Sequence, residues 1–277
     1  MDAYAGGLSW GGNALAVAAG EEIAVAATVG AGNNPPLKLS LIIPAFNEER
    51  LLGTTLASLN VARHIFIHRG WETELIVCDN NSTDRTAEIA RAAGATVVFE
   101  PVNQIGRARN TGAKTATGDW LLFIDADSQP SEELFAASAD LIASGRCLAG
   151  GSTIRLEPGH PSADFVCGIW NRISRWRRLL AGSFIFVEAA AFRQVGGFSE
   201  EFFAGEELDL SKRLHELAKK SGRRIVILHE HPLLTSARKV RLYSTWEHLR
   251  FVLRAGLRPH TALRDREACH SWYDGRR

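Results

Sequence analysis

The sequence predicts an α/β domain with a mostly parallel central sheet flanked by helices. Short apolar runs typical of strands alternate with segments of helical period from residue 37 to about residue 145. Strands separated by helices of this length form right-handed crossover units, which place the strands parallel to one another. The chain has 277 residues, of which 45% are hydrophobic, so it can bury a sizeable core. Disorder of the whole chain is therefore excluded.

The first half carries the regular alternation. Its strand segments are rich in β-branched and large apolar residues, whereas its helical segments repeat apolar residues every three or four positions. Ser82 is expected to be the N-cap of one helix, and Gly94 to occupy the C′ position after it. The expected strands are 37–44, 73–80, 95–100 and 119–125, and the expected helices are 47–59, 82–94, 106–118 and 131–145.

The second half is less regular. Strands are expected at 147–156, within 182–198 and at 223–228, and helices at 170–180 and 206–222. Beyond His229, helical segments rich in arginine are expected to about Leu257, followed by a polar tail.

Composition excludes several functional classes. Lys+Arg 32 against Asp+Glu 31 gives a formal charge of +1, so bulk charge does not indicate a nucleic-acid partner. The four cysteines form no C-x-x-C pair, which disfavours a zinc site and favours a reducing, cytoplasmic setting. Residues 1–36 lack a basic start, and Glu21 and Glu22 interrupt their apolar run. They are expected to be a flexible Gly/Ala-rich leader rather than a signal peptide or a membrane span.

Polar and acidic residues follow the ends of four expected strands. In open α/β sheets, ligands bind at the carboxyl ends of the strands. Asp125 and Asp127 stand one residue apart after a buried strand, and two such close charges need an opposing cation or open solvent. A metal ion, a basic side chain, or a solvated turn that caps the next helix would each account for them. The clustered segments are 44–48, 79–84, 101–109 and 125–127.

Four motifs carry a resemblance to a known family. They read LIIPAFNEE, CDNNSTDRT, GRARNTGAKTATGDWLLFIDADS and VGGFSEEFFAGEELDLSKRL. In order and spacing, they resemble the family 2 glycosyltransferases, which have the GT-A fold. The resemblance spans roughly Leu37 to Leu228. It implies inverting, metal-dependent transfer of a sugar from a nucleotide-sugar, by default a UDP-sugar and alternatively GDP-mannose, to an acceptor hydroxyl.

The resemblance also assigns a metal site. It implies that Asp125, Ala126 and Asp127 form a D-x-D motif whose carboxylates hold Mn²⁺ or Mg²⁺ together with the diphosphate of the donor. Two carboxylates on an extended segment would point the same way, and hard oxygen ligands suit these ions. His229 or His231 is expected to supply a third ligand, with Arg238 and Lys239 as cationic alternatives that contact the diphosphate.

The nucleoside site is assigned in the same way. The resemblance implies that Asp79 accepts a hydrogen bond from the base and that Pro44, Ala45 and Glu48 frame the nucleoside. Alternatively, the segment 79–84 only caps the helix that follows. Arg107 and Arg109 are expected to reach phosphates or to pair with the two aspartates, and a surface ion pair is the alternative for either residue.

The resemblance places the catalytic base at Glu207. The family pattern is usually Glu-Asp-x-Asp, whose second acid removes the proton of the acceptor hydroxyl, and this chain has Glu206, Glu207, Leu208 and Asp209 there. The longer glutamate moves the carboxylate outward by one methylene. Alternatively, the three acids only supply negative charge to the first turn of the helix.

The segment 170–180 has two tryptophans and four arginines in a helical window. It is expected to line an acceptor site, to touch an anionic membrane surface, or to be a surface helix whose tryptophans pack inward. The acceptor is expected to be a sugar, a lipid-linked molecule or a small molecule, and the chain is expected to be cytoplasmic or peripheral at the inner face of the membrane.

Four parts of the chain follow from this interpretation. They are the leader at 1–36, a nucleotide-sugar-binding half at 37–130, an acceptor-binding and catalytic-base half at 131–235, and a helical tail at 236–277. The alternatives to a glycosyltransferase are a nucleotidyltransferase and a non-catalytic sugar-nucleotide-binding protein. The first would need a glycine-rich loop after the first strand, which this chain lacks.

Overall fold

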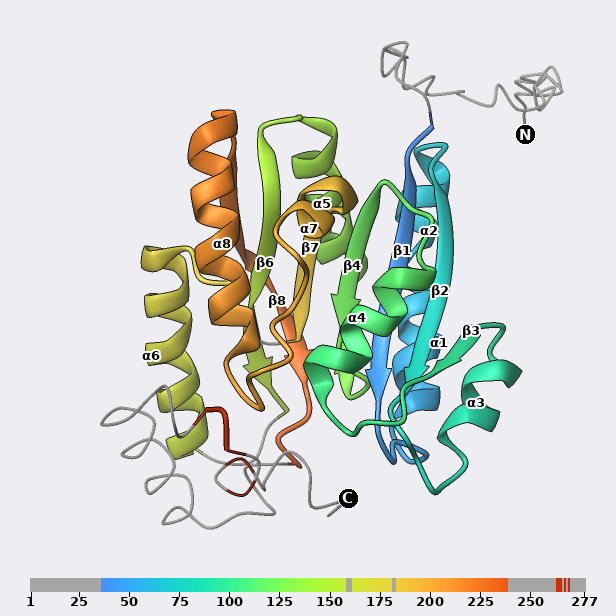
Figure 1. Cartoon of the computed structure of the whole chain (residues 1–277). Coiled ribbons are helices and arrows are strands. Elements are labelled where there is room, and N and C mark those ends of the chain that lie inside the picture. The colour runs from blue at the N-terminus through green and yellow to red at the C-terminus, as the bar shows by residue number, and fades with distance from the viewer. Residues whose placement is uncertain are drawn as a thin grey trace, which may run out of the picture. The chain divides into compact units, whose positions relative to one another are not determined.

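The computed structural model describes residues 36–157, 161–180, 183–238, 263–265, 267 and 269. The leader expected at 1–36, apart from Pro36, and most of the tail expected at 236–277 lie outside these residues. Figure 1 shows the described helices and strands, with a central sheet between layers of helices.

A single mixed sheet organises the described residues. Strand β7 runs antiparallel to both of its neighbours, β4 and β6. Because β6 therefore points the same way as β4, and β8 is parallel to β6, the carboxyl ends of β1, β2, β4, β6 and β8 lie along one edge. In order across the sheet, the strands are β3 (Thr96–Phe99), β2 (Glu72–Asp79), β1 (Lys38–Ala45), β4 (Trp120–Ile124), β7 (Phe184–Glu188), β6 (Cys147–Leu156), β8 (Arg224–Thr235) and β5 (Ser128–Gln129).

Helices cover both faces of the sheet (Figure 1). One face packs against α1, α2 and α5, and the other against α4, α7 and α8. Helix α6 contacts β6 and β8 beside α8. The described helices are α1 (Leu52–Ala62), α2 (His64–His68), α3 (Thr86–Ala92), α4 (Ile105–Thr115), α5 (Glu132–Ala143), α6 (Pro161–Arg177), α7 (Ala189–Gln194) and α8 (Glu206–Ser221).

The alternation of side chains along β1 builds both cores. Leu39, Leu41 and Ile43 face α1 and α5, whereas Ile42 faces α4. Successive side chains of a strand point to opposite faces, so a strand buried on both sides reads as a continuous apolar run. The expected α/β class with a mostly parallel sheet is therefore confirmed.

Two local predictions are wrong. The helix that was expected to be capped by Ser82 begins instead at Thr86, and Asp84 accepts the hydrogen bond of the Thr86 amide at 3.0 Å. The Ser82 hydroxyl is engaged elsewhere, since it accepts a hydrogen bond from the Asn47 amide at 3.0 Å. Residues just beyond His229 are not helical, because β8 continues to Thr235 by pairing with β6 and β5. Gly94 does follow its helix as expected, with φ of 80°.

Candidate functional site

Parallel strands bring the donor-side residues to one edge of the sheet. Pro44 and Ala45 at the end of β1 pair with Cys78 and Asp79 at the end of β2. Asp79 is buried, and its carboxylate accepts a hydrogen bond from the Ser82 amide at 2.9 Å. The expected nucleoside residues therefore share one corner of the sheet, beside the end of β4.

Two loops at this corner are locked together by side chains. Asn47 and Asn81 have left-handed φ angles of 52° and 66°, a region that asparagine tolerates. The Asn47 side chain accepts a hydrogen bond from the Thr83 amide at 2.8 Å. The loop after β1 and the loop after β2 thus hold each other in place without regular structure.

Arg238 joins the predicted nucleoside residue Glu48 to the predicted metal residue Asp127. Its guanidinium donates two hydrogen bonds to the Glu48 carboxylate, at 2.8 and 2.7 Å, and lies 3.6 Å from Asp127 Oδ2. The Arg238 and Asp127 side chains are only 14% and 13% exposed. An arginine from the segment after β8 therefore reaches the donor side of the site.

Arg109 is the centre of the other half of the site. It projects from α4 and donates hydrogen bonds to Asp125 at 2.9 Å, to Glu206 at 2.8 Å and to Glu207 at 3.3 Å. Its guanidinium also lies 5.2 Å from the centre of the Phe198 ring. One buried cation therefore links the predicted metal motif to the predicted catalytic base.

Acidic and basic side chains of the described residues meet in this cluster. Five carboxylates, those of Glu48, Asp125, Asp127, Glu206 and Glu207, face the guanidiniums of Arg109 and Arg238. Burial and the neighbouring Glu207 carboxylate raise the pKa of Glu206 to about 8. Burial alone would lower the pKa of Arg109, but the carboxylates around it raise that pKa above its ordinary value. Arg109 is thus a permanent cation, whereas Glu206 is a carboxyl that holds its proton near neutrality.

The Asp-Ala-Asp motif lies in a turn, so the expected extended backbone at 125–127 is wrong. Strand β4 ends at Ile124, and the Ser128 amide bonds back to the Asp125 carbonyl at 3.2 Å. The turn is fixed to its surroundings, because the Ala126 carbonyl accepts a hydrogen bond from the Thr55 hydroxyl at 2.7 Å. The two aspartates consequently meet different arginines instead of lying as a parallel pair.

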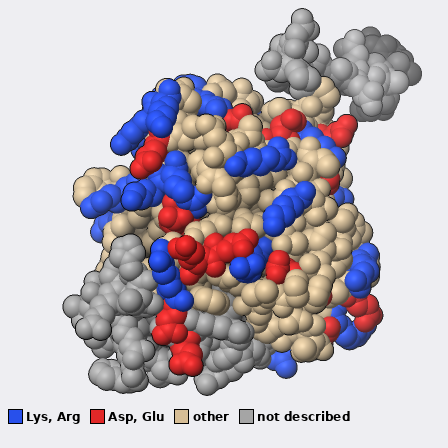
Figure 2. Space-filling model, viewed as in Figure 1, with Lys and Arg blue, Asp and Glu red and all other residues tan. Residues whose placement is uncertain are grey.

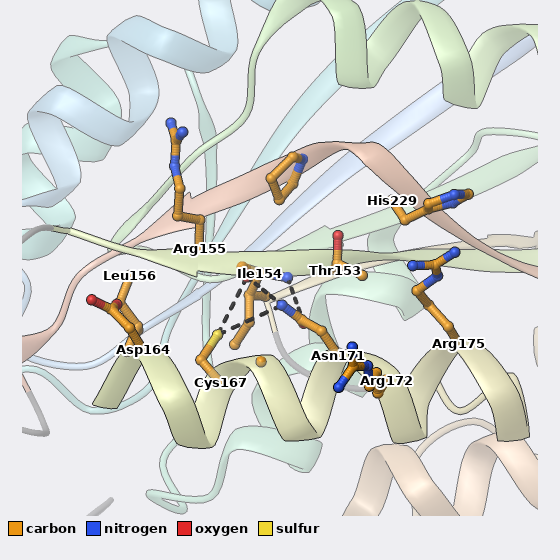
Figure 3. A pocket seen from close by; sticks show the side chains of 12 residues that line it. Thr153, Ile154, Arg155, Leu156, Asp164, Cys167, Asn171, Arg172, Arg175 and His229 are labelled. Atoms are coloured by element: carbon orange, nitrogen blue, oxygen red, sulfur yellow. Dashed lines mark hydrogen bonds between the residues drawn. The ribbon is translucent and has the colours of Figure 1, made fainter. Parts of the chain in front are cut away.

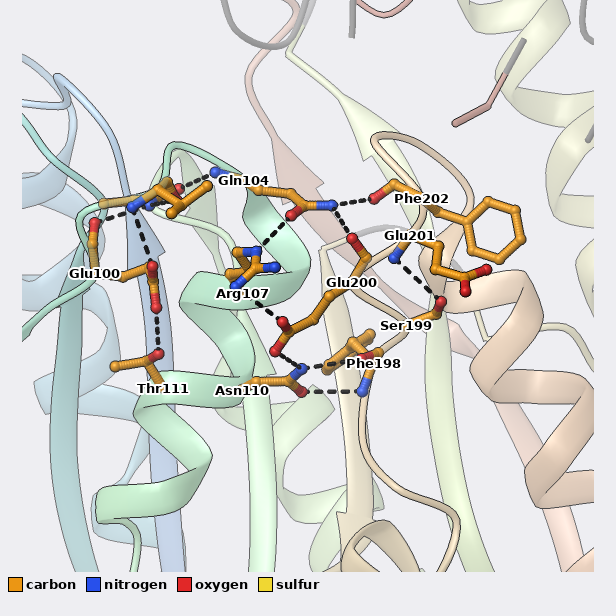
Figure 4. Close-up of polar contacts among 12 residues, drawn as sticks. Glu100, Gln104, Arg107, Asn110, Thr111, Phe198, Ser199, Glu200, Glu201 and Phe202 are labelled. Carbon is orange, nitrogen blue, oxygen red and sulfur yellow. Dashed lines mark hydrogen bonds and ion pairs between the residues drawn. The ribbon is translucent and has the colours of Figure 1, made fainter. Parts of the chain in front are cut away.

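Arg107 does not join Arg109 at the aspartates. It bonds to Gln104 Oε1 at 2.9 Å and to the Glu200 carboxylate at 2.9 Å, and its side chain is 36% exposed (Figure 4). This is an ion pair between α4 and the segment before α8.

The same face of α4 positions the segment that leads to the acids of α8 (Figure 4). Gln104 donates to the carbonyls of Glu200 and Phe202 at 2.9 and 2.8 Å. Asn110 donates to the Phe198 carbonyl and accepts from the Phe198 amide, both at 2.9 Å. The sequence reasoning missed these positioning residues. Their only signal is that polar residues recur along one face of an expected helix.

The three acids at the start of α8 have separate surroundings. Glu206 is buried, whereas the Glu207 side chain is 17% exposed, so Glu207 is the more accessible of the two glutamates beside Arg109. Asp209 instead pairs with Arg213 one turn along the helix, at 2.6 Å. The helix follows Gly205, whose φ of 78° is a conformation that favours glycine. Asp209 therefore supports the helix and lies apart from the Arg109 cluster.

The two histidines considered as a third metal ligand lie on β8. His229 is exposed and His231 is half-buried. Among the described residues, no three His, Cys, Asp or Glu side chains are grouped as a site that could hold a metal ion. The residue that reaches Asp127 from this part of the chain is Arg238, together with the Ser236 amide, which donates to the Asp127 carbonyl at 3.1 Å.

Comparison with known proteins gives a consistent result. Residues 40–158 match the model of a family described as glycosyl transferase family 2. A validoxylamine A glucosyltransferase of Streptomyces hygroscopicus subsp. limoneus is 28% identical over 235 residues, which are 69% of this chain and 50% of that protein. The chain thus spans half the length of this relative.

Two solved structures have the same fold. The mannosyltransferase PcManGT from Pyrobaculum calidifontis, in complex with GDP-Man and Mn²⁺, aligns with a TM-score of 0.61 and 19% identity over 86% of this chain and 69% of that chain. Glucosyl-3-phosphoglycerate synthase from Mycobacterium tuberculosis, in complex with Mn²⁺, UDP and phosphoglyceric acid, aligns with a TM-score of 0.56 and 20% identity over 84% and 78%. The expected GT-A fold is confirmed by these likenesses.

Proposed function

We propose that this chain, whose residues 40–158 match the model of glycosyl transferase family 2, transfers a sugar from a nucleotide-sugar donor to an acceptor hydroxyl. One observation carries the proposal: a single buried guanidinium, that of Arg109, contacts both Asp125 on the donor side and Glu207 on the base side. Residues 37–130 then supply the donor site, and residues 131–235 supply the base and the acceptor site.

The donor is proposed to be a UDP-sugar, with GDP-mannose as the alternative. Asp79 lies at the corner where a base would stack beside Pro44 and Ala45, and its buried carboxylate suits a hydrogen bond from a base N–H. The related structures support both donors, since one contains GDP-Man and another contains UDP. Arg238, between Glu48 and Asp127, is placed to contact the diphosphate.

Asp125 and Asp127 are proposed to be the ligands of a divalent cation that binds together with the donor. Hard carboxylate oxygens are the ligands that Mg²⁺ and Mn²⁺ prefer. Such an ion, when bound with the donor, neutralises negative charge on the departing diphosphate. The related structures that contain Mn²⁺ support this part of the proposal.

Glu207 is proposed to remove the proton of the acceptor hydroxyl. Its carboxylate is accessible and is oriented by Arg109, whereas Glu206 is buried behind it and acts as a positioning residue. The deprotonated oxygen would attack the anomeric carbon as the bond to the diphosphate breaks. A single displacement of this kind inverts the anomeric configuration. A general base contributes about 10²- to 10⁴-fold to the rate.

The experiment is a panel of nucleotide-sugars, tested with Mn²⁺ or Mg²⁺ by thermal shift and by release of the nucleoside diphosphate. A donor at about 100 times its Kd should stabilise the protein by about 2.7 kcal/mol. Glu207→Gln should abolish diphosphate release and keep the thermal shift, whereas Asp127→Ala should lose both. If no nucleotide-sugar raises the melting temperature, the proposal of a donor site is wrong.

Two exposed acids provide matched controls. Glu216 lies on α8 with Glu207, and Asp140 lies on α5, where its side chain is 70% exposed. Glu216→Gln and Asp140→Ala should retain the thermal shift and the release of diphosphate. Binding without turnover in the wild-type chain would favour the non-catalytic sugar-nucleotide-binding protein over the enzyme.

A further inference from the structure

Helix α6 exposes most of its large apolar side chains. Phe165 is 71% exposed and Trp176 is 76% exposed, the largest such values among the exposed hydrophobic side chains of the described residues. Val166, Ile169 and Ile173 are exposed as well. A helix on a globular protein ordinarily turns its apolar residues toward the core. This helix does the opposite.

The face of α6 that meets the sheet is polar instead. Asn171 brackets the backbone of Ile154 on β6: its amide donates to the Ile154 carbonyl at 2.8 Å, and its oxygen accepts from the Ile154 amide at 3.1 Å (Figure 3). The Cys167 thiol lies 3.3 Å from the same carbonyl, and Ser174 is buried. These directional hydrogen bonds hold the polar face of α6 against the sheet, and its apolar face therefore points outward.

Arginines border the outward apolar face of α6 on both sides. At about 100° per residue, the apolar side chains from Phe165 to Trp176 occupy an arc of about 100°. Arg172 and Arg175 border this arc on one side, and Arg177 borders it on the other. From Phe165 to Leu180 the sequence contains four arginines and no acid. In Figure 2, Lys and Arg side chains gather over the upper parts of α6 and α8.

We propose that the outward face of α6, defined as Phe165, Val166, Ile169, Ile173 and Trp176 with its flanking arginines, docks on a bilayer surface that contains anionic lipids. An apolar stripe bordered by arginine is typical of a helix that lies in the plane of the interface. Long arginine side chains keep their charge among headgroups while their stems cover apolar surface, and tryptophan is enriched at that depth.

Charge favours lipid over a second copy of this chain. Two copies that met through this face would bring two sets of three arginines together, which costs free energy in a poorly solvated interface. An anionic headgroup layer supplies the opposite charge. No described helix has the length and hydropathy of a membrane-spanning segment. The proposal does not depend on sugar transfer.

The test is sedimentation of the full chain with vesicles, in the absence of a donor. Wild-type protein should bind vesicles of phosphatidylcholine mixed with phosphatidylglycerol, and should bind pure phosphatidylcholine vesicles more weakly. Phe165→Ser combined with Trp176→Ser should lower the bound fraction at least about tenfold. Arg172→Gln combined with Arg175→Gln should weaken binding to the anionic vesicles about fivefold per arginine, and should reduce its dependence on salt.

A matched pair of exposed apolar residues lies elsewhere on the chain. Val61 on α1 and Ile67 on α2 are 56% and 45% exposed, so Val61→Ser combined with Ile67→Ser controls for a general loss of surface hydrophobicity. This control should bind like the wild type. Vesicles with brominated acyl chains should quench the fluorescence of the wild type, and quench Trp176→Phe less.

Three outcomes would overturn the proposal. In the first, wild-type protein binds neither kind of vesicle. In the second, the serine variant of α6 binds as well as the wild type while circular dichroism shows that it is folded. In the third, sedimentation velocity shows a dimer that the same variant dissociates, which would make a second copy the occupant of this face. None of these results depends on whether diphosphate release is observed.

Discussion

Glu206→Gln removes a titrating proton from the centre of the site and keeps the size and hydrogen-bonding capacity of the side chain. Glu206 is 1% exposed and bonds to Arg109 at 2.8 Å. Arg109 also serves Asp125 and Glu207, so one positive charge faces three carboxyl groups. Burial, reinforced by the Glu207 carboxylate, raises the pKa of Glu206 from 4.5 to about 8.

The sign of the effect follows from proton linkage. Between pH 4.5 and about pH 8 the folded chain holds the proton of Glu206 and the unfolded chain does not. The contribution of Glu206 to the free energy of unfolding is therefore fully present below pH 4.5 and is lost as the pH rises through about 8. The slope is about 1.36 kcal/mol per pH unit, so the free energy of unfolding should fall by about 4 kcal/mol between roughly pH 5 and pH 8 because of Glu206 alone.

Urea unfolding across this pH range measures the effect. Other titrating groups are common to both proteins, so the difference between wild type and Glu206→Gln isolates Glu206. The variant should be the more stable protein at pH 8, and its advantage should shrink toward pH 5. For Glu216→Gln, an exposed change on the same helix, the free energy of unfolding should change with pH as it does in the wild type. If the free energy of unfolding of Glu206→Gln also follows that of the wild type across this pH range, to within about 1 kcal/mol, the Glu206 carboxyl does not hold its proton.

Three further outcomes follow from the same contacts. Arg109→Met leaves buried carboxylates without their shared cation and should cost about 3–5 kcal/mol in urea unfolding at neutral pH; an unchanged midpoint would contradict the role of Arg109. Arg238→Gln should weaken donor binding about tenfold in a thermal-shift titration, with acceptor affinity unchanged. Gly197→Ala should cost about 1–3 kcal/mol in thermal unfolding, because φ is +71° and an added Cβ would lie 2.7 Å from Asn110 Oδ1; the neighbouring Gly196→Ala shares the strained φ but meets no atom within 4 Å and should cost less.

The sheet was predictable because its strands are buried on both faces. Such strands read as continuous apolar runs, and the expected strand at 147–156 agrees with β6 at both ends. Local polar chemistry was less predictable, because several side chains compete for the same amide groups. Ser82 and Asp84 are both suitable helix caps, and only the contact of Ser82 with Asn47 on another loop decides between them.

The sequence predicted which acids lie at strand ends, but it did not predict which side chains pair with one another in the site. The sequence places Asp125 near an expected strand end, yet it contains no local signal that Arg109 will be shared with Glu206 and Glu207, which lie 97 and 98 residues away. Arg238 is even more distant from Glu48, by 190 residues. Contacts of this kind form only when the whole sheet is assembled. Residue type and spacing therefore identify the residues of the site, but not which of them contact each other.

The shared guanidinium has a consequence for how the two halves of the site act. Arg109 is held by carboxylates on two sides and by the Phe198 ring, and Phe198 is itself fixed to Asn110 on the same helix. A change in charge at Asp125, such as the arrival of a cation with the donor, weakens the attraction between Asp125 and Arg109. Arg109 would then interact more strongly with Glu206 and Glu207. If the proposed donor brings a cation to Asp125, donor binding and the orientation of Glu207 would be coupled through the side chain of Arg109.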